Sequence, residues 1–134
     1  MLPYCHKVQY YETDKMQITH HSNYVRIMEE ARIDFFEKIG FPYHTFEEKG
    51  ILSPVVRLSC EYKKTTTYPD EITVEVSVAE CKKLKFTLAY TMTVDGQTVF
   101  TGTSTHCFLD ENGKPVPFTL FPAFYDAMQQ RAEK

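Results

Sequence analysis

Several features that would indicate particular classes of protein are missing from this chain of 134 residues. It has no basic excess, since its formal net charge is −3, whereas nucleic-acid-binding domains are usually strongly basic. Its apolar runs are far shorter than the roughly 20 residues that cross a bilayer. Residues 1–10 contain no apolar stretch of signal-peptide length. The sequence therefore predicts a cytoplasmic protein that neither binds nucleic acid nor spans a membrane.

The chain also lacks a metal-binding or redox motif. Its four cysteines are Cys5, Cys60, Cys81 and Cys107. None forms a Cys-x-x-Cys pair, so we interpret them as free thiols that pack as small apolar side chains in a reducing compartment. The adjacent His20 and His21 do not suggest a metal site, because neighbours on an extended segment point in opposite directions and no nearby spacing completes a ligand set. No metal and no cofactor are expected.

The length predicts a single domain over residues 1–134. A chain of this size buries roughly two thirds of the surface that its unfolded form exposes, so it needs neither a disulfide nor a structural metal. Tryptophan is absent, and the aromatic residues, which make up 14% of the chain, are all Phe and Tyr. Such a ring-rich core suits a curved sheet packed on one helix.

The hydrophobic pattern predicts one long helix followed by a series of strands. Ser22 or Asn23 is expected to cap a helix over residues 22–39, with Gly40 as its stop. Apolar positions cover more than half of this helix, which is typical of a central helix. The other predicted elements are strands over residues 4–12, 55–64, 71–81, 84–94 and 98–109, a helical turn over 43–49 and a helix over 123–131. This order indicates an α+β fold with a mostly antiparallel sheet.

The most informative segment is the loop before the long helix, which contains Asp14. A helix start offers unpaired backbone N–H groups and a partial positive charge. A carboxylate and such donors are the two components of an acyl-transfer site, namely a base or nucleophile and an oxyanion site. Taken alone, these residues favour a structural role for Asp14 in an Asx turn.

The spacing around Asp14 matches a known motif. The residues that carry the match are Thr13-Asp14, Asn23-Tyr24 and Glu30-Ala31-Arg32. Similar segments farther along are Lys49-Gly50-Ile51, Tyr62-Lys63-Lys64, Tyr68 and Asp70-Glu71. The chain thereby resembles the 4-hydroxybenzoyl-CoA thioesterase family over roughly residues 4–118, and most closely its YbgC-type acyl-CoA thioesterase branch.

The resemblance implies a hotdog fold, in which an antiparallel sheet of about five strands wraps around one long central helix. It implies hydrolysis of an acyl-CoA thioester to a free acid and CoA without a cofactor. It also implies a homodimer or homotetramer, with active sites between protomers.

The resemblance further assigns roles to residues near the helix start. Asp14 takes the place of the catalytic carboxylate, as nucleophile or general base. His21 stands where the family supplies a backbone N–H that polarises the thioester oxygen, and a contribution from its side chain is equally open. Asn23 and Tyr24 match the residues that open the helix.

Two further pairs are assigned by resemblance. Lys82 and Lys83 align with basic residues that meet the phosphates of CoA; the alternative is that they are solvated residues at strand ends. Met16 and Gln17 occupy positions where the family usually has glycine, so we expect their side chains to reshape or narrow the pocket.

Two other functions stay open at this stage. One is a different hotdog enzyme, an acyl-carrier-protein thioesterase or a dehydratase, although no match to a dehydratase His motif is present. The other is a non-catalytic acyl-CoA-binding or scaffold protein, which the missing glycines make conceivable.

Overall fold

A computed structural model describes residues 2–133 of the chain. Its elements are β1 (Tyr4–Lys7), the 3-10 helix η1 (Tyr10–Glu12), α1 (Ser22–Lys38), α2 (Tyr43–Glu47), β2 (Val55–Tyr62), β3 (Glu71–Cys81), β4 (Phe86–Val94), β5 (Gln97–His106), the 3-10 helix η2 (Phe118–Leu120) and α3 (Pro122–Ala132). The strands form one sheet in the order β1-β3-β4-β5-β2, and each neighbouring pair is antiparallel. The predicted α+β architecture is confirmed.

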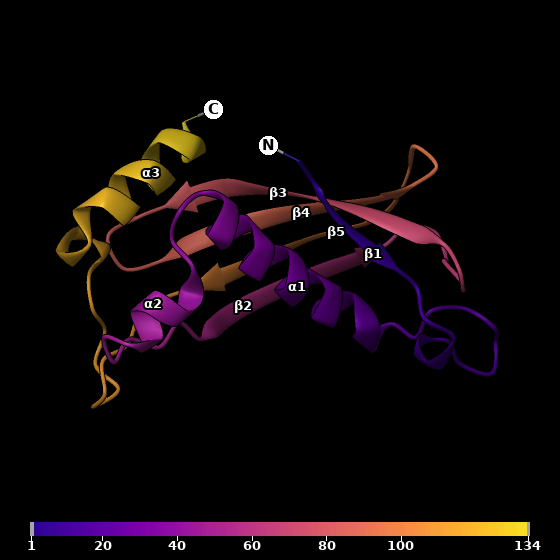
Figure 1. The fold of residues 1–134 in the computed structure, drawn as a ribbon, viewed down its shortest axis with the longest axis horizontal. Coiled ribbons are helices and arrows are strands. Elements are labelled where there is room, and N and C mark those ends of the chain that lie inside the picture. Colours follow the sequence, from indigo (N-terminus) through magenta and orange to yellow (C-terminus); the bar gives the residue numbers. More distant parts are fainter. Residues whose placement is uncertain (1, 134) are drawn as a thin grey trace.

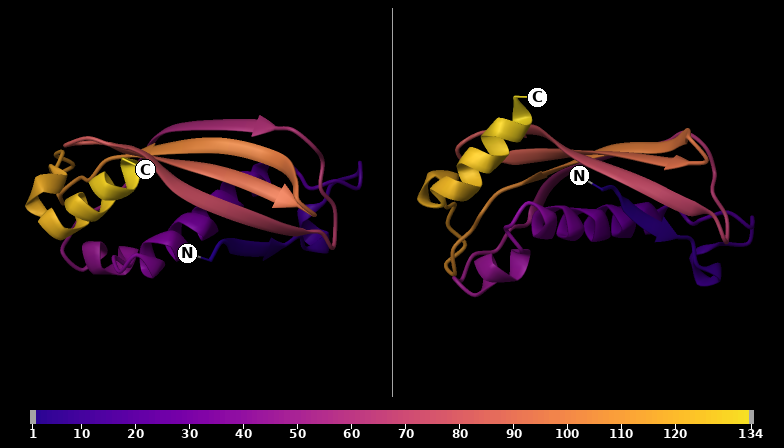
Figure 2. Two further views of the ribbon diagram at one scale, coloured as in Figure 1. Left: turned by 90° about the horizontal axis from the view of Figure 1, so that it is seen from above. Right: turned by 45° about the horizontal axis from the view of Figure 1, so that its top comes forward.

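The long helix α1 lies along one face of the curved sheet, and α3 packs at one end of it (Figure 1; Figure 2). The buried side chains of α1 are Tyr24, Ile27, Met28, Ala31, Phe35 and Phe36. They recur every three or four residues, which places them on one side of the helix. The curved sheet covers much of the surface of α1. This coverage explains why the apolar face of the helix is wide, as is typical of a central helix.

Phenylalanine rings fill the core near α3. Phe36 of α1 lies 5.8 Å from Phe86 of β4, and Phe108 lies 5.4 Å from Phe124 of α3, measured between ring centroids. The Phe86 ring also contacts Phe124 at 6.0 Å. Such edge-to-face and stacked contacts stabilise the packing of α3 on the sheet.

Asp95 and Gly96 form the two-residue turn between β4 and β5, and an Asp-Gly pair favours such a turn. Their φ angles are 50° and 78°, and two positive φ angles are what a type I′ hairpin turn requires. Gly40, with φ 92°, follows the end of α1 and confirms the predicted helix stop.

The first strand is shorter than predicted. It ends at Lys7 rather than at residue 12, because Tyr10–Glu12 forms the 3-10 helix η1. The Glu12 carboxylate accepts a hydrogen bond from the Gln9 N–H at 2.7 Å, which favours this turn over an extended strand. As a result Glu12 is buried rather than following the alternation of a strand.

Candidate active site

Asp14 lies in a short closed loop between η1 and α1. Thr13 and Thr19 form an antiparallel bridge that closes this loop, and the Asp14 N–H donates to the Ile18 carbonyl at 3.0 Å. Asp14 Oδ1 accepts the Met16 N–H at 2.8 Å, which is an Asx turn. Its Oδ2 accepts no hydrogen bond within residues 2–133, so this half-buried carboxylate holds the turn with one oxygen and leaves the other available.

The Asp14 loop borders a pocket of about 540 Å³. Two exposed rings, Tyr10 and Tyr68, line it with their centroids 6.1 Å apart, and Lys15 lies beside them. Lys7 Nζ is 5.9 Å from the centroid of the Tyr68 ring. The pocket therefore combines a carboxylate with aromatic rings and nearby cations.

Met16 and Gln17 stand where the resemblance leads us to expect glycine. Gln17 has φ 64°, in the left-handed region that glycine adopts at little steric cost. The Thr67 hydroxyl donates to the Gln17 carbonyl at 2.7 Å and stabilises this conformation. Gln17 lines the Asp14 pocket, whereas Met16 is 71% exposed and lies outside its lining.

The start of α1 differs from the prediction. His21 is the N-cap residue, and neither Ser22 nor Asn23 caps the helix. Ser22 Oγ lies 2.8 Å from His20 Nδ1, and Asn23 Nδ2 donates to the Glu12 carbonyl at 2.9 Å, so both side chains have other partners. The backbone N–H of His21 donates no hydrogen bond within residues 2–133, and it lies where the helix carries its partial positive charge.

The side chains of His21 and Tyr24 have different environments. The His21 ring is exposed, and the Tyr62 hydroxyl donates to the His21 carbonyl at 3.1 Å. Tyr24 is buried, stacks on Phe100 with ring centroids 5.1 Å apart, and has its hydroxyl 2.9 Å from Thr66 Oγ1. Burial raises the pKa of Tyr24, so this hydroxyl stays protonated and supports the core beneath the helix start.

Lys82 and Lys83 lie in the turn between β3 and β4, at the other end of the sheet from Asp14 (Figure 1). The intervening strand β3 has 11 residues, which span roughly 33 Å at about 3.3 Å per residue. Lys82 lines a basic pocket of about 240 Å³ together with Arg57 and Lys85, and Lys83 does not. Glu80 also lines this pocket, and its Oε1 lies 2.9 Å from Lys82 Nζ. One chain therefore does not bring Asp14 and these lysines together, and Arg57 is a member of the basic pocket that sequence patterns did not reveal.

A buried chain of polar groups joins α1 to the sheet and was not predicted. Arg32 Nη1 donates to the Tyr90 hydroxyl at 3.2 Å, which lies 2.6 Å from Ser104 Oγ, and His106 Nε2 lies 2.8 Å from the same Ser104 oxygen. Burial, with a smaller contribution from the Arg32 charge, lowers the pKa of His106 to about 3. His106 is therefore neutral at neutral pH. A lone His within a strand gives no sequence signal for such a network.

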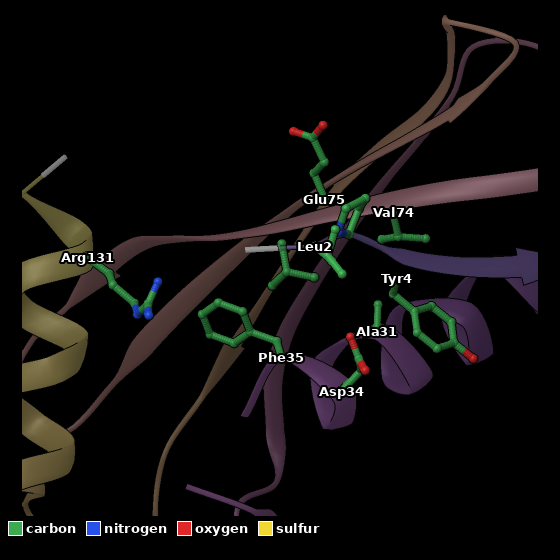
Figure 3. A pocket seen from close by; sticks show the side chains of 10 residues that line it. Leu2, Tyr4, Ala31, Asp34, Phe35, Val74, Glu75 and Arg131 are labelled. Carbon is green, nitrogen blue, oxygen red and sulfur yellow. The ribbon is translucent and has the colours of Figure 1, made fainter. Parts of the chain in front are cut away.

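A separate pocket of about 280 Å³ lies at the β1 edge of the sheet, where β1, β3, α1 and α3 meet (Figure 3). Its wall combines apolar side chains with Asp34, Glu75 and Arg131. Arg131 extends from α3 to within 5.7 Å of the centroid of the Phe35 ring. None of the predicted site residues lines this pocket.

The described part of the chain has few other groups suited to catalysis. Within residues 2–133, no cluster of three or more His, Cys, Asp or Glu side chains is placed to hold a metal ion. No helix in that range combines the length and the apolar character needed to cross a membrane. The four cysteines are unpaired, and burial raises the pKa of Cys81 to about 11, which disfavours thiolate chemistry there.

Comparisons with known proteins identify the family. Residues 8–131 match the thioesterase-like superfamily. The chain is 38% identical over 113 residues to an Aquifex aeolicus (strain VF5) protein provisionally named an esterase, a match that covers 84% of this chain and 88% of that protein. It is 34% identical over 127 residues to a Bacillus subtilis (strain 168) protein with the provisional name acyl-CoA thioesterase YneP, which covers 92% of each. The solved structure of a DHNA-CoA thioesterase from Staphylococcus aureus superposes with a TM-score of 0.92 at 32% identity, over 96% of this chain and 89% of that one.

The fold and these matches define a hotdog thioesterase. This chain therefore belongs to the thioesterase-like superfamily, and it is a thioester hydrolase. The resemblance to the 4-hydroxybenzoyl-CoA thioesterase family is confirmed, as is the predicted sheet wrapped around one helix.

We predict that His106 makes the fold sensitive to acid. Its pKa is 6.5 ordinarily and about 3 in the folded protein, so between these values the unfolded chain binds more protons. The free energy of unfolding should therefore fall as the pH drops through this window, by up to about 1.4 kcal/mol per pH unit. Denaturant unfolding at a series of pH values gives this slope for wild type and for His106→Gln, which does not titrate. A shallower slope is expected in the variant, and equal slopes would contradict the prediction.

Proposed function

We propose that this protein hydrolyses acyl-CoA thioesters with Asp14 as the reacting carboxylate. The observation that carries the proposal is the geometry of the loop. A half-buried carboxylate with one oxygen available precedes a helix start at which the His21 N–H has no acceptor among residues 2–133. The family and the names of its relatives supply the class of reaction.

Two mechanisms use these groups. As a nucleophile, Asp14 adds to the thioester carbonyl carbon, the C–S bond breaks, CoA leaves as a thiolate, and water hydrolyses the resulting anhydride. As a general base, Asp14 takes a proton from water while the water oxygen adds to the same carbon, and the C–S bond then breaks so that CoA leaves as a thiolate and the free acid remains. In both, an N–H at the helix start stabilises the negative charge on the carbonyl oxygen, and losing one such donor typically costs about 3 kcal/mol.

We further propose that two copies of the chain pair through β2. This strand is at the edge of the sheet. Its exposed apolar side chains include Val55, Val56, Leu58 and Tyr62, with exposures of 42% to 49%. A long edge strand with exposed apolar side chains favours pairing with another strand.

Such pairing would build an active site from two protomers. A two-fold axis through β2 makes the two copies of the strand antiparallel. The beginning of β2 lies beside the basic pocket, which Arg57 lines, and its end lies beside the Asp14 loop, because the Tyr62 hydroxyl bonds to His21. The basic pocket of one protomer would then lie beside the Asp14 loop of its partner.

The basic pocket favours CoA as the leaving group. Arg57, Lys82 and Lys85 present cations to the phosphates of CoA, while the rings of Tyr10 and Tyr68 offer a surface for an aromatic acyl group near Asp14. DHNA-CoA is the first substrate to test, because the Staphylococcus aureus enzyme is named for it. The unpaired cysteines support a cytoplasmic location.

We expect Asp14→Asn to lower kcat by at least about 1,000-fold without changing Tm or CoA binding. Asn keeps the hydrogen bond from the Met16 N–H, but it neither attacks a carbonyl nor takes a proton at neutral pH. Thiol release from acyl-CoA measures kcat and KM. Asp110→Asn is the matched control, since Asp110 forms the same kind of turn with the Asn112 N–H, at 2.8 Å. A variant that keeps most of the wild-type kcat would refute the role of Asp14.

For the basic pocket, we expect Lys82→Glu with Lys85→Glu to raise KM for acyl-CoA about tenfold, which corresponds to about 1.4 kcal/mol. Little change in kcat should follow, because contacts to the nucleotide bind ground and transition states equally. The effect should shrink at high salt and vanish for a truncated thioester without the nucleotide. The exposed Lys114→Glu is the control. An equal loss on the truncated thioester would show that the two lysines act on structure instead.

A further inference from the structure

His6 and Glu12 form a buried polar cluster at the base of the Asp14 loop. Their side chains are 11% and 6% exposed. His6 Nε2 lies 2.9 Å from Glu12 Oε1, and His6 Nδ1 lies 2.9 Å from Oε1 of Glu30. A single imidazole ring on β1 thus joins η1 to α1, although His6 and Glu30 are 24 residues apart in the sequence.

Both ring nitrogens of His6 take part in the cluster. The contacts between this ring and the Glu12 carboxylate offset part of the cost of burying that polar group. The Tyr4 hydroxyl also donates to Glu30 Oε1, at 2.8 Å. Burial, together with the hydrogen bond to Glu30, raises the pKa of Tyr4 to about 12, so this donor persists at neutral pH.

Glu12 holds both ends of the Asp14 loop. Its carboxylate accepts the Gln9 N–H at 2.7 Å, on the side where the chain enters. Its carbonyl accepts the His20 N–H at 2.8 Å and the Asn23 side-chain amide at 2.9 Å, on the side where the chain leaves for α1. Fixing Glu12 therefore fixes the base of the loop against the first turn of the helix.

We propose that His6 and Glu12 are positioning residues that hold Asp14 at a set distance from the start of α1. This inference rests on the proposed function, in which Asp14 and an N–H of the helix start act on one carbonyl group. The carboxylate belongs to the loop and the donor belongs to the helix, so their spacing depends on the join between these elements. A misplacement of about 1 Å can reduce a rate on the order of 100-fold.

The test compares His6→Phe with the double variant His6→Phe/Glu12→Gln. The single variant keeps an aromatic ring but removes the imidazole nitrogens that contact the buried Glu12 carboxylate, so it should lose stability. The double variant replaces that carboxylate with a neutral amide and should recover much of the Tm, but residue 6 no longer joins η1 to Glu30. We expect the kcat of the double variant to stay 10- to 100-fold below wild type, because a displacement of the loop by up to about 1 Å would cause a loss of this size. Its KM should be nearly unchanged. His44→Phe, at an exposed histidine of α2, is the control.

Hydrogen exchange of the backbone amides supplies a second measurement that does not depend on catalysis. The Asp14 and His20 amides, which bond to Ile18 and Glu12, should exchange faster in the double variant than in wild type. A folded double variant with wild-type kcat, or one whose Asp14 and His20 amides exchange at wild-type rates, would overturn the inference. Failure of the proposed function would give a different result from failure of this inference. In that case Asp14→Asn would remain active, whatever the amide exchange rates of the double variant.

Discussion

The position of Asp14 depends on how the chain turns from the first strand into the long helix. Glu12 accepts hydrogen bonds from both sides of this turn, and its buried carboxylate faces His6. Ordering a loop costs roughly 1–2 kcal/mol of backbone entropy per residue, and the hydrogen bonds that close this loop offset part of that cost. In the proposed mechanism, a rigid join matters because a carboxylate and an oxyanion donor from different elements have to reach the same carbonyl group.

The strand order has an equally large effect on the site. In the order β1-β3-β4-β5-β2, the Asp14 loop lies at one end of the sheet and the basic pocket at the other. If these two regions bind the two ends of acyl-CoA, as we propose, a single chain would hold that molecule poorly. Leu58 on the edge strand β2 remains 42% exposed. The apolar surface that a second copy would bury therefore lies along the strand that would bring these ends together.

The parts of the fold that the sequence predicted are those determined by local patterns. The wide apolar face of residues 22–39 identified the central helix. Asp95-Gly96 is a pair that favours a hairpin turn, because few residue pairs adopt two positive φ angles. The Asp14 loop was recognised from its spacing. The Gln17 conformation fits the family pattern, since its φ of 64° is one that glycine favours.

The parts that could not be predicted depend on contacts between distant residues. Strand alternation gave no sign that Glu12 would be buried against His6, because a 3-10 turn replaces the end of the strand. The chain from Arg32 to His106 likewise needs three elements in place before its hydrogen bonds exist. Sequence order also does not say which end of a sheet a turn occupies, so the separation of Lys82 from Asp14 became visible only in the fold.

Complementation between two variants is the most direct test of an active site shared between protomers. Asp14→Asn and Lys82→Glu/Lys85→Glu are co-expressed with different affinity tags, the mixed dimer is purified, and thiol release is measured at acyl-CoA well below KM. In the mixed dimer, one site would combine an intact Asp14 with the partner's intact lysines. The account predicts activity clearly above the mean of the two parent variants. Activity that stays at that mean would show that Asp14 and the lysines serve the same protomer, and would contradict a shared site.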